Sequence, residues 1–374
     1  MRVEIRMVRS HAESEVYIRL PYVLYKHESC FVPPLLRDER RFHDPQHNGA
    51  IIKCDTVRFL AYVQGQPVGR IMGIIHHGYN HLHEQNDCRF FQLDCIDDVE
   101  VAQMLLTTVE AWGKAMGMTR MIGPFGFSEK DPQGVQTEGS HLEPVIASAS
   151  HPDYLCKLIQ SAGYLKFKEC VSFIVQLPIQ LPKVYQDIFK RLQRESRYRV
   201  LSIKSRAQLK TYFKDVQSLL NLAYEHIYGF DPLSEEDIQN MADEYLSLIN
   251  PQFVKFVEYT PEQRIVGFVL AMPNLAKGFR KANGSLWPWG LLQLIWQLKH
   301  SKKLDLLLGG VHPAHQGKGL TALLAMDLMK SAADAGMHQL DSHLILEDNA
   351  LMCAEMIRLG GSLEKRYRIF QKSI

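Results

Sequence analysis

The chain repeats one order of sequence patterns after about two hundred residues. A run that alternates like a β-strand ends at a serine with a helix-cap pattern, first at Ser10 and again at Ser205, 195 residues later. The β-hairpins that follow share a Val-Gly step, at Gly69 and Gly267, which lie 198 residues apart. Two nearly equal offsets in the same order predict that one α/β unit occurs twice in the chain.

A third recurring pattern predicts an insertion. A strand, a helix and a Gly-Met pair end at Gly117 in the first copy and at Gly336 in the second, so this offset is 219 residues. The increase from 198 to 219 places 21 additional residues between Gly267 and Gly336. The most apolar stretch, WPWGLLQLIWQLKH at residues 287–300, lies in that interval. We expect it to cover the junction between the copies, or to line an apolar substrate tunnel.

The repeat divides the 374 residues into two domains of similar size. We expect a first domain at residues 1–178 and a second at residues 198–374. Residues 179–197 are expected to form a linker and helix, because a proline-containing PIQLP stretch lies at the boundary. With 46% hydrophobic residues, the chain can build two apolar cores, which excludes a disordered or collagen-like protein.

Charge and cysteine usage narrow the class of protein. A net charge of +2 argues against a dedicated nucleic-acid binder. Residues 190–210 nevertheless carry eight basic side chains and one acid, which form either a solvated surface or a patch for phosphate. Seven cysteines without a CxxC pair indicate a reduced compartment. Without a signal-peptide pattern or an apolar run near the ~20 residues of a membrane span, we expect a cytoplasmic protein.

The residues after one buried strand predict an anion-binding site. A leucine run ends in Gly309-Gly310-Val311, and after a proline turn the chain continues as Gln316-Gly317-Lys318-Gly319-Leu320 into a helix. Glycines let backbone N–H groups crowd around an anion, and the helix dipole favours negative charge there. A phosphate or pyrophosphate is therefore the expected ligand. The segment lacks a Walker A motif and matches only part of a Rossmann fingerprint.

This segment resembles the pyrophosphate loop of the GNAT acetyltransferase superfamily. Residues 311–320 match the family pattern V-x-P-x-x-[QR]-G-x-G, and the later LEDN and LGG strings at 346–349 and 359–361 resemble the family's next strand, asparagine and second helix. The resemblance implies that Val311 hydrogen-bonds the pantetheine arm of acetyl-CoA, or of another acyl-CoA, and that Asn349 lies near its thiol. It also implies that the pyrophosphate is held by backbone amides of Gln316, Gly317, Lys318, Gly319, Leu320 and Thr321.

The resemblance implies a fold as well: two tandem GNAT-like acyl-CoA N-acyltransferase domains, each a central mixed twisted sheet flanked by helices. The first copy has Ile96-Asp-Asp-Val-Glu100 where the loop should be. Three carboxylates would repel a pyrophosphate, so we expect this copy to be degenerate and not to bind CoA. Two such copies resemble the tandem arrangement of Fem-type aminoacyltransferases and protein N-myristoyltransferase.

Two positions depart from the family pattern. Thr321 stands where Gly or Ala is usual; it is bulkier, but its hydroxyl can contact phosphate. The family often has a tyrosine seven residues after the asparagine, which protonates the leaving thiolate, and this chain has Met356 there. A thioether cannot transfer a proton, so the proton has to come from bulk water or from a nearby group such as Cys353.

Acyl transfer to an amine also needs a group that accepts the ammonium proton. Glu347 and Asp348 end a predicted strand beside the expected thioester and are candidate bases; otherwise they stabilise a helix N-terminus. Glu258, in the second hairpin, is a third candidate, or else a solvent-facing residue opposite Lys255. No metal is expected, because the histidines of residues 76–83 lack the spacing of a metal motif.

Three further segments are candidates for the acceptor side. Asp341 and His343 share one face of a late strand, as a catalytic dyad or a buried polar pair. The aromatic residues of 224–228 lie near a helix end, where they contact the acceptor or pack in the core. Residues 126–151 lack periodicity and form either a lid or a surface excursion.

The leading interpretation is an acyl-CoA-dependent N-acyltransferase, most simply an N-acetyltransferase that acts on an amine of a small molecule by direct attack. One alternative is a Fem-like aminoacyltransferase with charged tRNA, which the intact loop disfavours; nucleic acid is otherwise not an expected partner. Another is a non-catalytic module that binds CoA or another ligand, which Met356 favours. The sequence leaves the acceptor, the acyl length and the oligomeric state open.

Overall fold

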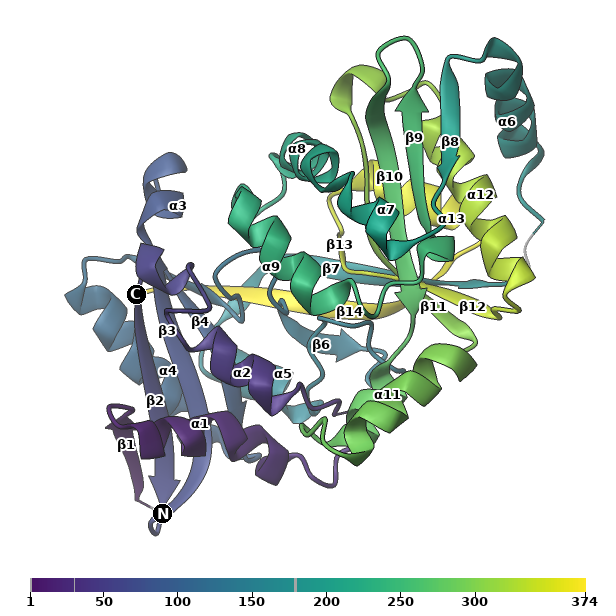
Figure 1. The fold of residues 1–374 in the computed structure, drawn as a ribbon. Helices are drawn as coiled ribbons and strands as arrows, with labels where there is room; N and C mark the ends of the chain where they lie inside the picture. The colour runs from purple at the N-terminus through teal and green to yellow at the C-terminus, as the bar shows by residue number, and fades with distance from the viewer. Residues whose placement is uncertain (1, 30, 178–179) are drawn as a thin grey trace.

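One continuous mixed sheet runs through the molecule, with helices on its faces (Figure 1). The computed structural model describes residues 2–29, 31–177 and 180–374, and of residues 242–245 it describes the backbone alone. The described residues form a sheet of 14 strands. The expected α/β class, a mixed sheet flanked by helices, is confirmed.

The two halves of the chain place the same kinds of elements in nearly the same order. The first half contains β1 (Val3–Met7), α1 (His11–Leu24), α2 (Leu36–Phe42), β2 (Cys54–Val63), β3 (Gln66–His76), α3 (His77–Leu82), β4 (Asp87–Cys95), α4 (Val99–Ala115), β5 (Arg120–Gly123), β6 (Val135–Glu138), α5 (Tyr154–Ser161) and β7 (Leu165–Gln176). The second half contains α6 (Lys183–Glu195), β8 (Tyr198–Ser202), α7 (Arg206–Lys210), α8 (Phe213–Tyr224), α9 (Glu235–Tyr245), β9 (Val254–Tyr259), β10 (Arg264–Pro273), α10 (Ala276–Ala282), α11 (Trp289–His300), β11 (Lys303–Val311), α12 (Leu320–Asp334), β12 (Gln339–Ser342), β13 (Ile345–Leu346), α13 (Ala350–Arg358) and β14 (Ser362–Ser373). Short 3-10 turns occur at Ile51–Lys53, Pro251–Phe253 and Pro313–His315.

The landmarks of the predicted repeat occupy equivalent places. Ser10 caps α1 and Ser205 caps α7, each through its side chain. Gly69 of β3 lies opposite Cys95 at the end of β4, and in the second half Gly267 of β10 lies opposite Val311 at the end of β11. This shared register makes Cys95 the structural counterpart of Val311.

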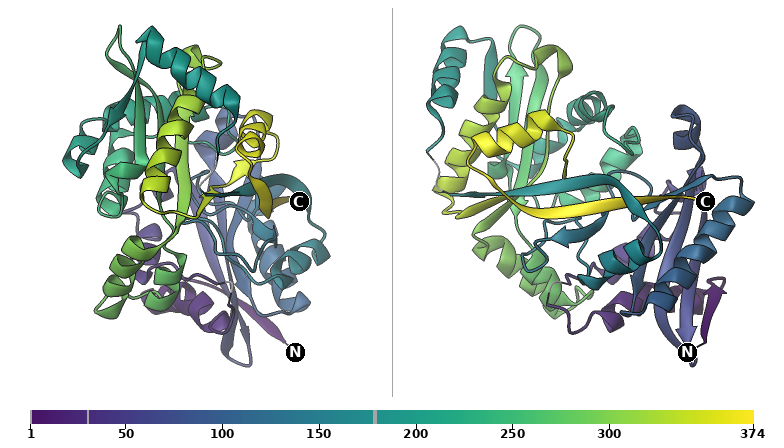
Figure 2. Two further views of the ribbon diagram at one scale, coloured as in Figure 1. Left: turned by 90° about the vertical axis from the view of Figure 1, so that its right-hand side faces the viewer. Right: turned by 180° about the vertical axis from the view of Figure 1, so that it is seen from behind.

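The last strand of each half belongs to the sheet of the other half. β14, from the end of the chain, pairs with β5, whereas β7 pairs with β12 of the second half. β7 and β14 pair with each other at the centre, where Figure 2 shows them side by side across the molecule. The boundary at residues 178–198 stays a prediction, but each half-sheet is completed by a strand from across that boundary.

The predicted insertion lies mainly between β10 and β11. Gly267 and Val311 are 44 residues apart, whereas Gly69 and Cys95 are 26 residues apart, so 18 residues are added here. They fold as the helical pair α10 and α11, in place of the six-residue α3 of the first half. The rest of the predicted 21-residue difference lies in the loop before α12 and in the length of that helix.

Two further expectations concern the setting of the protein. No helix in the described part of the chain is long and apolar enough to cross a membrane. The six cysteines within the described residues are free, while Cys30 lies outside them. A cytoplasmic location stays a prediction.

Candidate functional site

β11 and β12 run parallel at first and then separate. Lys303 to Leu306 pair with Gln339 to Ser342, and the N–H of His343 donates the last hydrogen bond, to the carbonyl of Leu306 at 2.8 Å. Beyond this point β13 pairs with β7, while β11 continues along β10 to Val311. The separation leaves one edge of β11 without a neighbouring strand, so its backbone groups there need other hydrogen-bond partners.

The segment between β11 and α12 forms a cradle of backbone N–H groups. Gly317 and Gly319 have φ values of 71° and 91°, a left-handed backbone that glycine adopts without strain. Gly319 is the N-cap of α12 and offers no side-chain hydrogen bond to the first turn. The N–H groups at the start of this helix therefore remain available to an anion, which the helix dipole also favours.

The side chains of the loop hold its own backbone in shape. The amide Nε2 of Gln316 donates to the carbonyl of Val311 at 3.3 Å, and Nζ of Lys318 donates to the carbonyl of Ala314 at 2.9 Å. The side chain of Thr321 is exposed on the first turn of α12. The predicted donor-site residues from Val311 to Thr321 thus lie together, around one strand end and one helix start.

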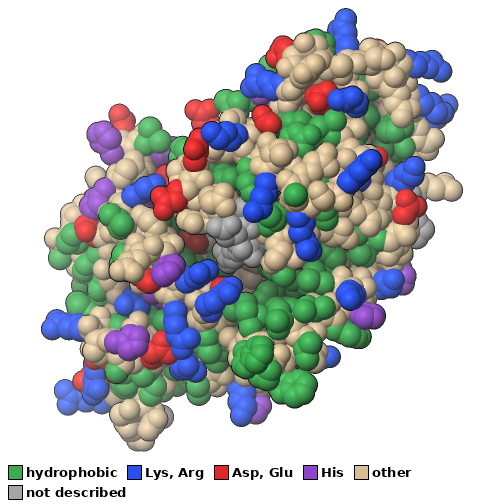
Figure 3. Space-filling view, in the orientation of Figure 1, with side chains coloured by type: hydrophobic (Ala, Val, Ile, Leu, Met, Phe, Trp, Pro, Cys, Tyr) green, Lys and Arg blue, Asp and Glu red, His purple; other side chains and the backbone are tan. Residues whose placement is uncertain are grey.

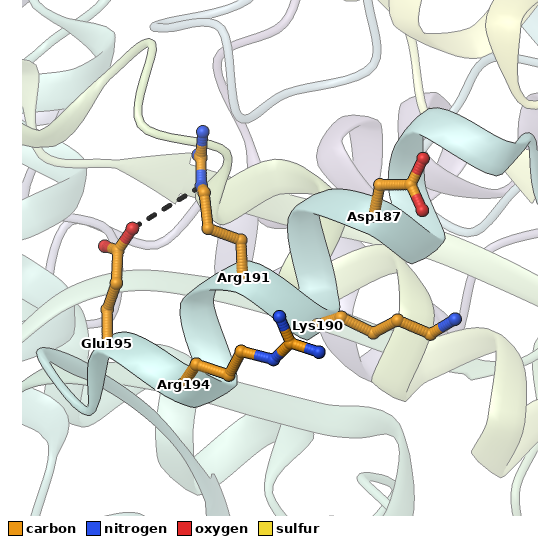
Figure 4. A pocket seen from close by; sticks show the side chains of 5 residues that line it. All are labelled: Asp187, Lys190, Arg191, Arg194 and Glu195. Atoms are coloured by element: carbon orange, nitrogen blue, oxygen red, sulfur yellow. Dashed lines mark ion pairs between the residues drawn. The ribbon is translucent and has the colours of Figure 1, made fainter.

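Helix α6 adds positive charge beside this loop. Its Arg191 donates from Nη2 to the carbonyl of Lys318 at 3.4 Å and forms an ion pair with Glu195 at 3.7 Å. Figure 4 shows a shallow hollow on α6, lined by these two residues and by Asp187, Lys190 and Arg194. One helix supplies the whole lining, so the hollow is an open charged surface. Its cations come from the basic stretch seen in the sequence.

In the first half, a side chain already caps the helix that follows the equivalent strand end. Asp98, the N-cap of α4, follows Cys95 by only three positions, whereas Gly319, the N-cap of α12, follows Val311 by eight. One oxygen of Asp98 accepts from the N–H groups of Glu100 and Val101, at 2.8 and 3.2 Å. This carboxylate already occupies the N–H groups that an anion would use.

Tyrosine hydroxyls also bind the equivalent strand edge in the first half. The N–H of Cys95 donates to the hydroxyl of Tyr25 at 3.2 Å. The hydroxyl of Tyr154 donates to the carbonyl of Cys95 at 2.8 Å. Backbone groups that are satisfied within the fold are not available to a pantetheine arm.

The predicted cofactor contact Asn349 lies at the start of α13. Its side-chain oxygen accepts from the N–H of Met352 at 3.2 Å and so caps the helix. Met356 is fully buried in the core of the second half. Cys353 is half-buried, and burial raises the pKa of its thiol.

Two of the predicted bases are paired with lysines of β7. Glu347 lies 2.5 Å from Nζ of Lys166, and Asp348 lies 2.5 Å from Nζ of Lys168. Both carboxylates follow β13 and remain at least partly exposed. Their role as bases stays a prediction, and a reaction that used them would have to separate these ion pairs.

The third predicted base lies further from the separation of β11 and β12. Glu258 is on β9, and β10 lies between β9 and β11. Its carboxylate pairs with Arg199 of β8, with 3.0 Å between Oε1 and Nη2. The structure therefore does not bring Glu258 together with Glu347 and Asp348.

Tyr224 contacts the edge of β11, and Glu129 lies close enough to Tyr224 to influence its pKa. The hydroxyl of Tyr224, at the end of α8, donates to the carbonyl of Gly309 at 3.1 Å and accepts from its N–H at 3.4 Å. Burial raises the pKa of Tyr224 to about 12, and the carboxylate of Glu129 contributes to this rise. Burial also raises the pKa of Glu129 to about 7.

Glu129 comes from the first half of the chain, which explains why its role escaped the sequence patterns. It lies in the aperiodic segment 126–151, and its Oε2 accepts from the N–H of Asp231 at 3.3 Å. Its side chain is 9% exposed. For Tyr224, the sequence signal was the aromatic cluster at a helix end.

A buried polar cluster lies where β11 and β12 are still paired. The carboxylate of Asp341 accepts from Oγ of Ser172 at 2.8 Å and forms ion pairs with Lys303 and Lys365. Burial lowers the pKa of His343 to about 4, so its imidazole is neutral near pH 7. The partners of Asp341 support the interpretation as a buried polar residue that connects β7, β11, β12 and β14.

No protein-family model matches the chain. Two bacterial proteins are similar over nearly the whole length. Protein YghO of Escherichia coli (strain K12) is 25% identical over 377 residues, which cover 99% of this chain and 95% of that protein. The Bacterial ceramide synthase of Caulobacter vibrioides (strain NA1000 / CB15N) is 26% identical over 377 residues, with coverages of 98% and 96%.

Solved structures share the arrangement of both halves. A tandem GNAT protein from the clavulanic acid biosynthesis pathway has a TM-score of 0.56 at 12% identity, covering 100% of this chain and 98% of that one. A GCN5-related N-acetyltransferase from Sphaerobacter thermophilus has a TM-score of 0.52 at 10% identity, with coverages of 99% and 95%. At these identities the likeness concerns the fold. The chain has the tandem GNAT fold that its sequence predicted.

Proposed function

We propose that the protein is an acyl-CoA-dependent N-acyltransferase with its donor site in the second half. The likeness to GNAT acetyltransferases supports acyl transfer in general. One observation carries the location of the site: α12 begins at Gly319 without a side-chain cap, next to the exposed edge of β11. A strand edge and a helix start suit the two parts of CoA, an amide-containing arm and a pyrophosphate.

Different residues of the cradle would bind different parts of the acyl-CoA. The backbone N–H of Val311 would bind a pantetheine amide, and the N–H groups of residues 316–321 would bind the pyrophosphate. Lys318 and Arg191 would offset its charge from the two sides of the loop. We retain Asn349 as a residue near the thiol, at the start of α13.

The reaction needs one proton acceptor and one proton donor. An acyl-CoA supplies the activated thioester. Glu129, with a pKa of about 7, would accept the proton of the attacking ammonium, directly or through water. Tyr224, whose pKa of about 12 keeps it protonated, would donate a proton to the leaving thiolate, the role that Met356 cannot perform. Glu347, Asp348 and Glu258 remain alternative bases.

We propose an amine as acceptor, and a lipid amine ahead of a polar metabolite. The relative called Bacterial ceramide synthase supports this choice, because a ceramide is an amide and its synthesis needs an amine. The acyl length is proposed on the same ground to exceed that of acetyl-CoA. The donor site itself does not depend on either choice.

The donor site can be tested with two substitutions at Gly317, one that adds a negative charge and one of similar size that is neutral. A Cβ there meets open space, and Asp and Asn both tolerate its left-handed backbone. Gly317→Asp places a negative charge in the cradle, whereas Gly317→Asn adds the same volume without charge. Titration calorimetry with acetyl-CoA and palmitoyl-CoA should show an affinity loss of about 100-fold or more for Asp, and of only a few fold for Asn.

Several outcomes would contradict the proposal. Equal losses in the two variants would point to backbone strain, and no binding of any acyl-CoA by the unmodified protein would remove the donor site. Binding without thiol release, across a panel of short and long amines, would identify a ligand-binding module. Acyl transfer that required charged tRNA would favour the aminoacyltransferase alternative.

A further inference from the structure

Helix α11 presents a large apolar surface to solvent. Trp287, Trp289 and Trp296 are 82%, 72% and 52% exposed. Together with three exposed aliphatic residues they form what we call the α11 surface: Trp287, Trp289, Leu291, Leu292, Ile295 and Trp296. Figure 3 shows hydrophobic side chains gathered over this helix. Contiguous exposed apolar patches on a folded protein mark contact with a partner or a membrane.

The opposite side of the same helix is already packed. Leu294 is buried in a cluster with Met272 and Leu275. Gln297 is buried too, and its Nε2 donates to the carbonyl of Asn274 at 3.3 Å. A Cβ on Gly278 of α10 would lie 2.9 Å from Cδ2 of Leu294, so the two helices touch closely. The outward direction of the tryptophans is therefore a consequence of the packed fold.

The segment that contains the α11 surface carries charges of one sign. Residues 276–304 contain six lysines and arginines and no aspartate or glutamate. Lys281, Lys299 and Lys302 are exposed, and none of them has an ion pair with a side chain that the structure describes. Nζ of Lys281 lies 5.5 Å above the ring of Trp296, at the border of the apolar face.

This charge pattern selects one kind of partner. Two copies of the chain meeting through this surface about a two-fold axis would place the same unpaired lysines near each other. An anionic lipid surface instead complements both parts: phosphates meet the lysines, and the aliphatic side chains enter the acyl region. Indole rings favour the interface between the two, because they are apolar with one polar N–H.

We propose that the α11 surface binds the protein to anionic membranes, lying in the interface without crossing the bilayer. The first half has a six-residue helix, α3, between its corresponding strands, so this surface belongs to the second half. The apolar cluster under α11 includes Leu307, where β11 leaves β12, so the helix connects the membrane side to the donor site. Binding is independent of the proposed reaction and is tested without it.

The experiment is vesicle flotation of the full chain, read together with tryptophan emission. Vesicles of phosphatidylcholine alone are compared with vesicles that also contain phosphatidylglycerol. Three of the four tryptophans lie on the α11 surface, so emission should shift to the blue on binding. We expect binding to the anionic vesicles that weakens as salt is raised.

Two sets of variants separate the apolar and the electrostatic contributions. Trp287→Ser, Trp289→Ser and Trp296→Ser together should reduce binding at least about tenfold, and single Trp287→Ser serves if the triple change unfolds the chain. Lys281→Gln, Lys299→Gln and Lys302→Gln should remove the preference for phosphatidylglycerol. Ile52→Ser with Leu351→Ser, at exposed positions elsewhere, is the matched control and should bind like the unmodified protein.

Three results would overturn the proposal. The first is absence of binding to either kind of vesicle, and the second is equal binding by the folded tryptophan variant. The third is a dimer in light scattering that becomes a monomer in the tryptophan variant without any vesicle binding, which would assign the surface to a second copy. Retained acyl-CoA binding in the variants would show that a negative result concerns the membrane alone.

Discussion

The two halves of this protein place an equivalent strand end and helix start at the same point of the sheet, yet the hydrogen bonds made there differ. In the first half, Asp98 caps the helix, and tyrosine hydroxyls satisfy the backbone of Cys95. In the second half, Gly319 leaves the helix start uncapped, eight residues after Val311. The second half thus differs from the first at this point by five extra residues and by the absence of a side-chain cap.

The same difference has an energetic side. A side-chain cap stabilises a helix by about 1 kcal/mol, so the second half gives up that stabilisation where it keeps its N–H groups available. The first half gains the cap and loses the cradle. The comparison indicates a structural role for the first half at its own strand end, while its segment 126–151 supplies Glu129 to the other half.

The largest expected effect tests the catalytic side of the comparison. Tyr224→Phe removes the hydroxyl beside Gly309 and should lower the rate of thiol release by about 10²–10⁴-fold, as for the loss of a general acid. The affinity for acyl-CoA should change only a few fold. The measurement is steady-state thiol release beside calorimetry. An equal loss of affinity would mean that Tyr224 only positions β11.

The next effect concerns Glu129 and pH. Its folded pKa of about 7 lies above its ordinary value of 4.5, so the folded protein holds a proton that the unfolded chain releases between these values. The stabilisation present below pH 4.5 is therefore lost as pH rises to about 7, by roughly 3 kcal/mol. Unfolding in urea at pH 5 and pH 8 should show most of this loss, and Glu129→Gln should reduce it.

The catalytic readout of Glu129 follows the same titration. Thiol release should increase with pH through about 7 in the unmodified protein and lose this dependence in Glu129→Gln. If Glu129→Gln keeps the pH profile of the rate, the base is Glu347, Asp348 or Glu258 instead. A variant that changes stability alone would make Glu129 a structural residue.

A smaller effect is expected at the cap of the first half. Asp98→Ala removes both hydrogen bonds to the first turn of α4 and should destabilise the protein by about 1 kcal/mol. Thermal unfolding measures the change, with exposed Asp97→Ala as its control. The affinity for acyl-CoA should be unaffected. Weaker acyl-CoA binding would show that the first half contributes to the donor site.

The smallest effect is expected at the tyrosine that closes the first strand edge. Tyr154→Phe leaves the carbonyl of Cys95 without its hydroxyl donor and should cost about 0.5–1 kcal/mol in the free energy of unfolding. Acyl-CoA should still bind at one site per chain. A second site in this variant would contradict the view that the first half lacks a cradle.

Local patterns carried much of the prediction. Gly317 and Gly319 indicated a glycine-rich turn before a helix, and the structure has that turn, with both glycines in a left-handed backbone, and begins α12 at Leu320. The Val-Gly steps at Gly69 and Gly267 set the common register of the two hairpins. Such features depend on neighbouring residues, so a single sequence contains them.

The tertiary structure decided what depends on distant residues. Alternating apolar patterns identify β7 and β14 as strands but do not encode which half-sheet each one completes. The apolar stretch at 287–300 was expected to cover the junction between the copies or to line a tunnel, yet packing on α10 buries only one side of it. The sequence by itself thus determined the repeat and the glycine turn before α12, which local backbone preferences specify. Only the tertiary structure placed Glu129 beside the second half and exposed the tryptophans, because long-range packing specifies both.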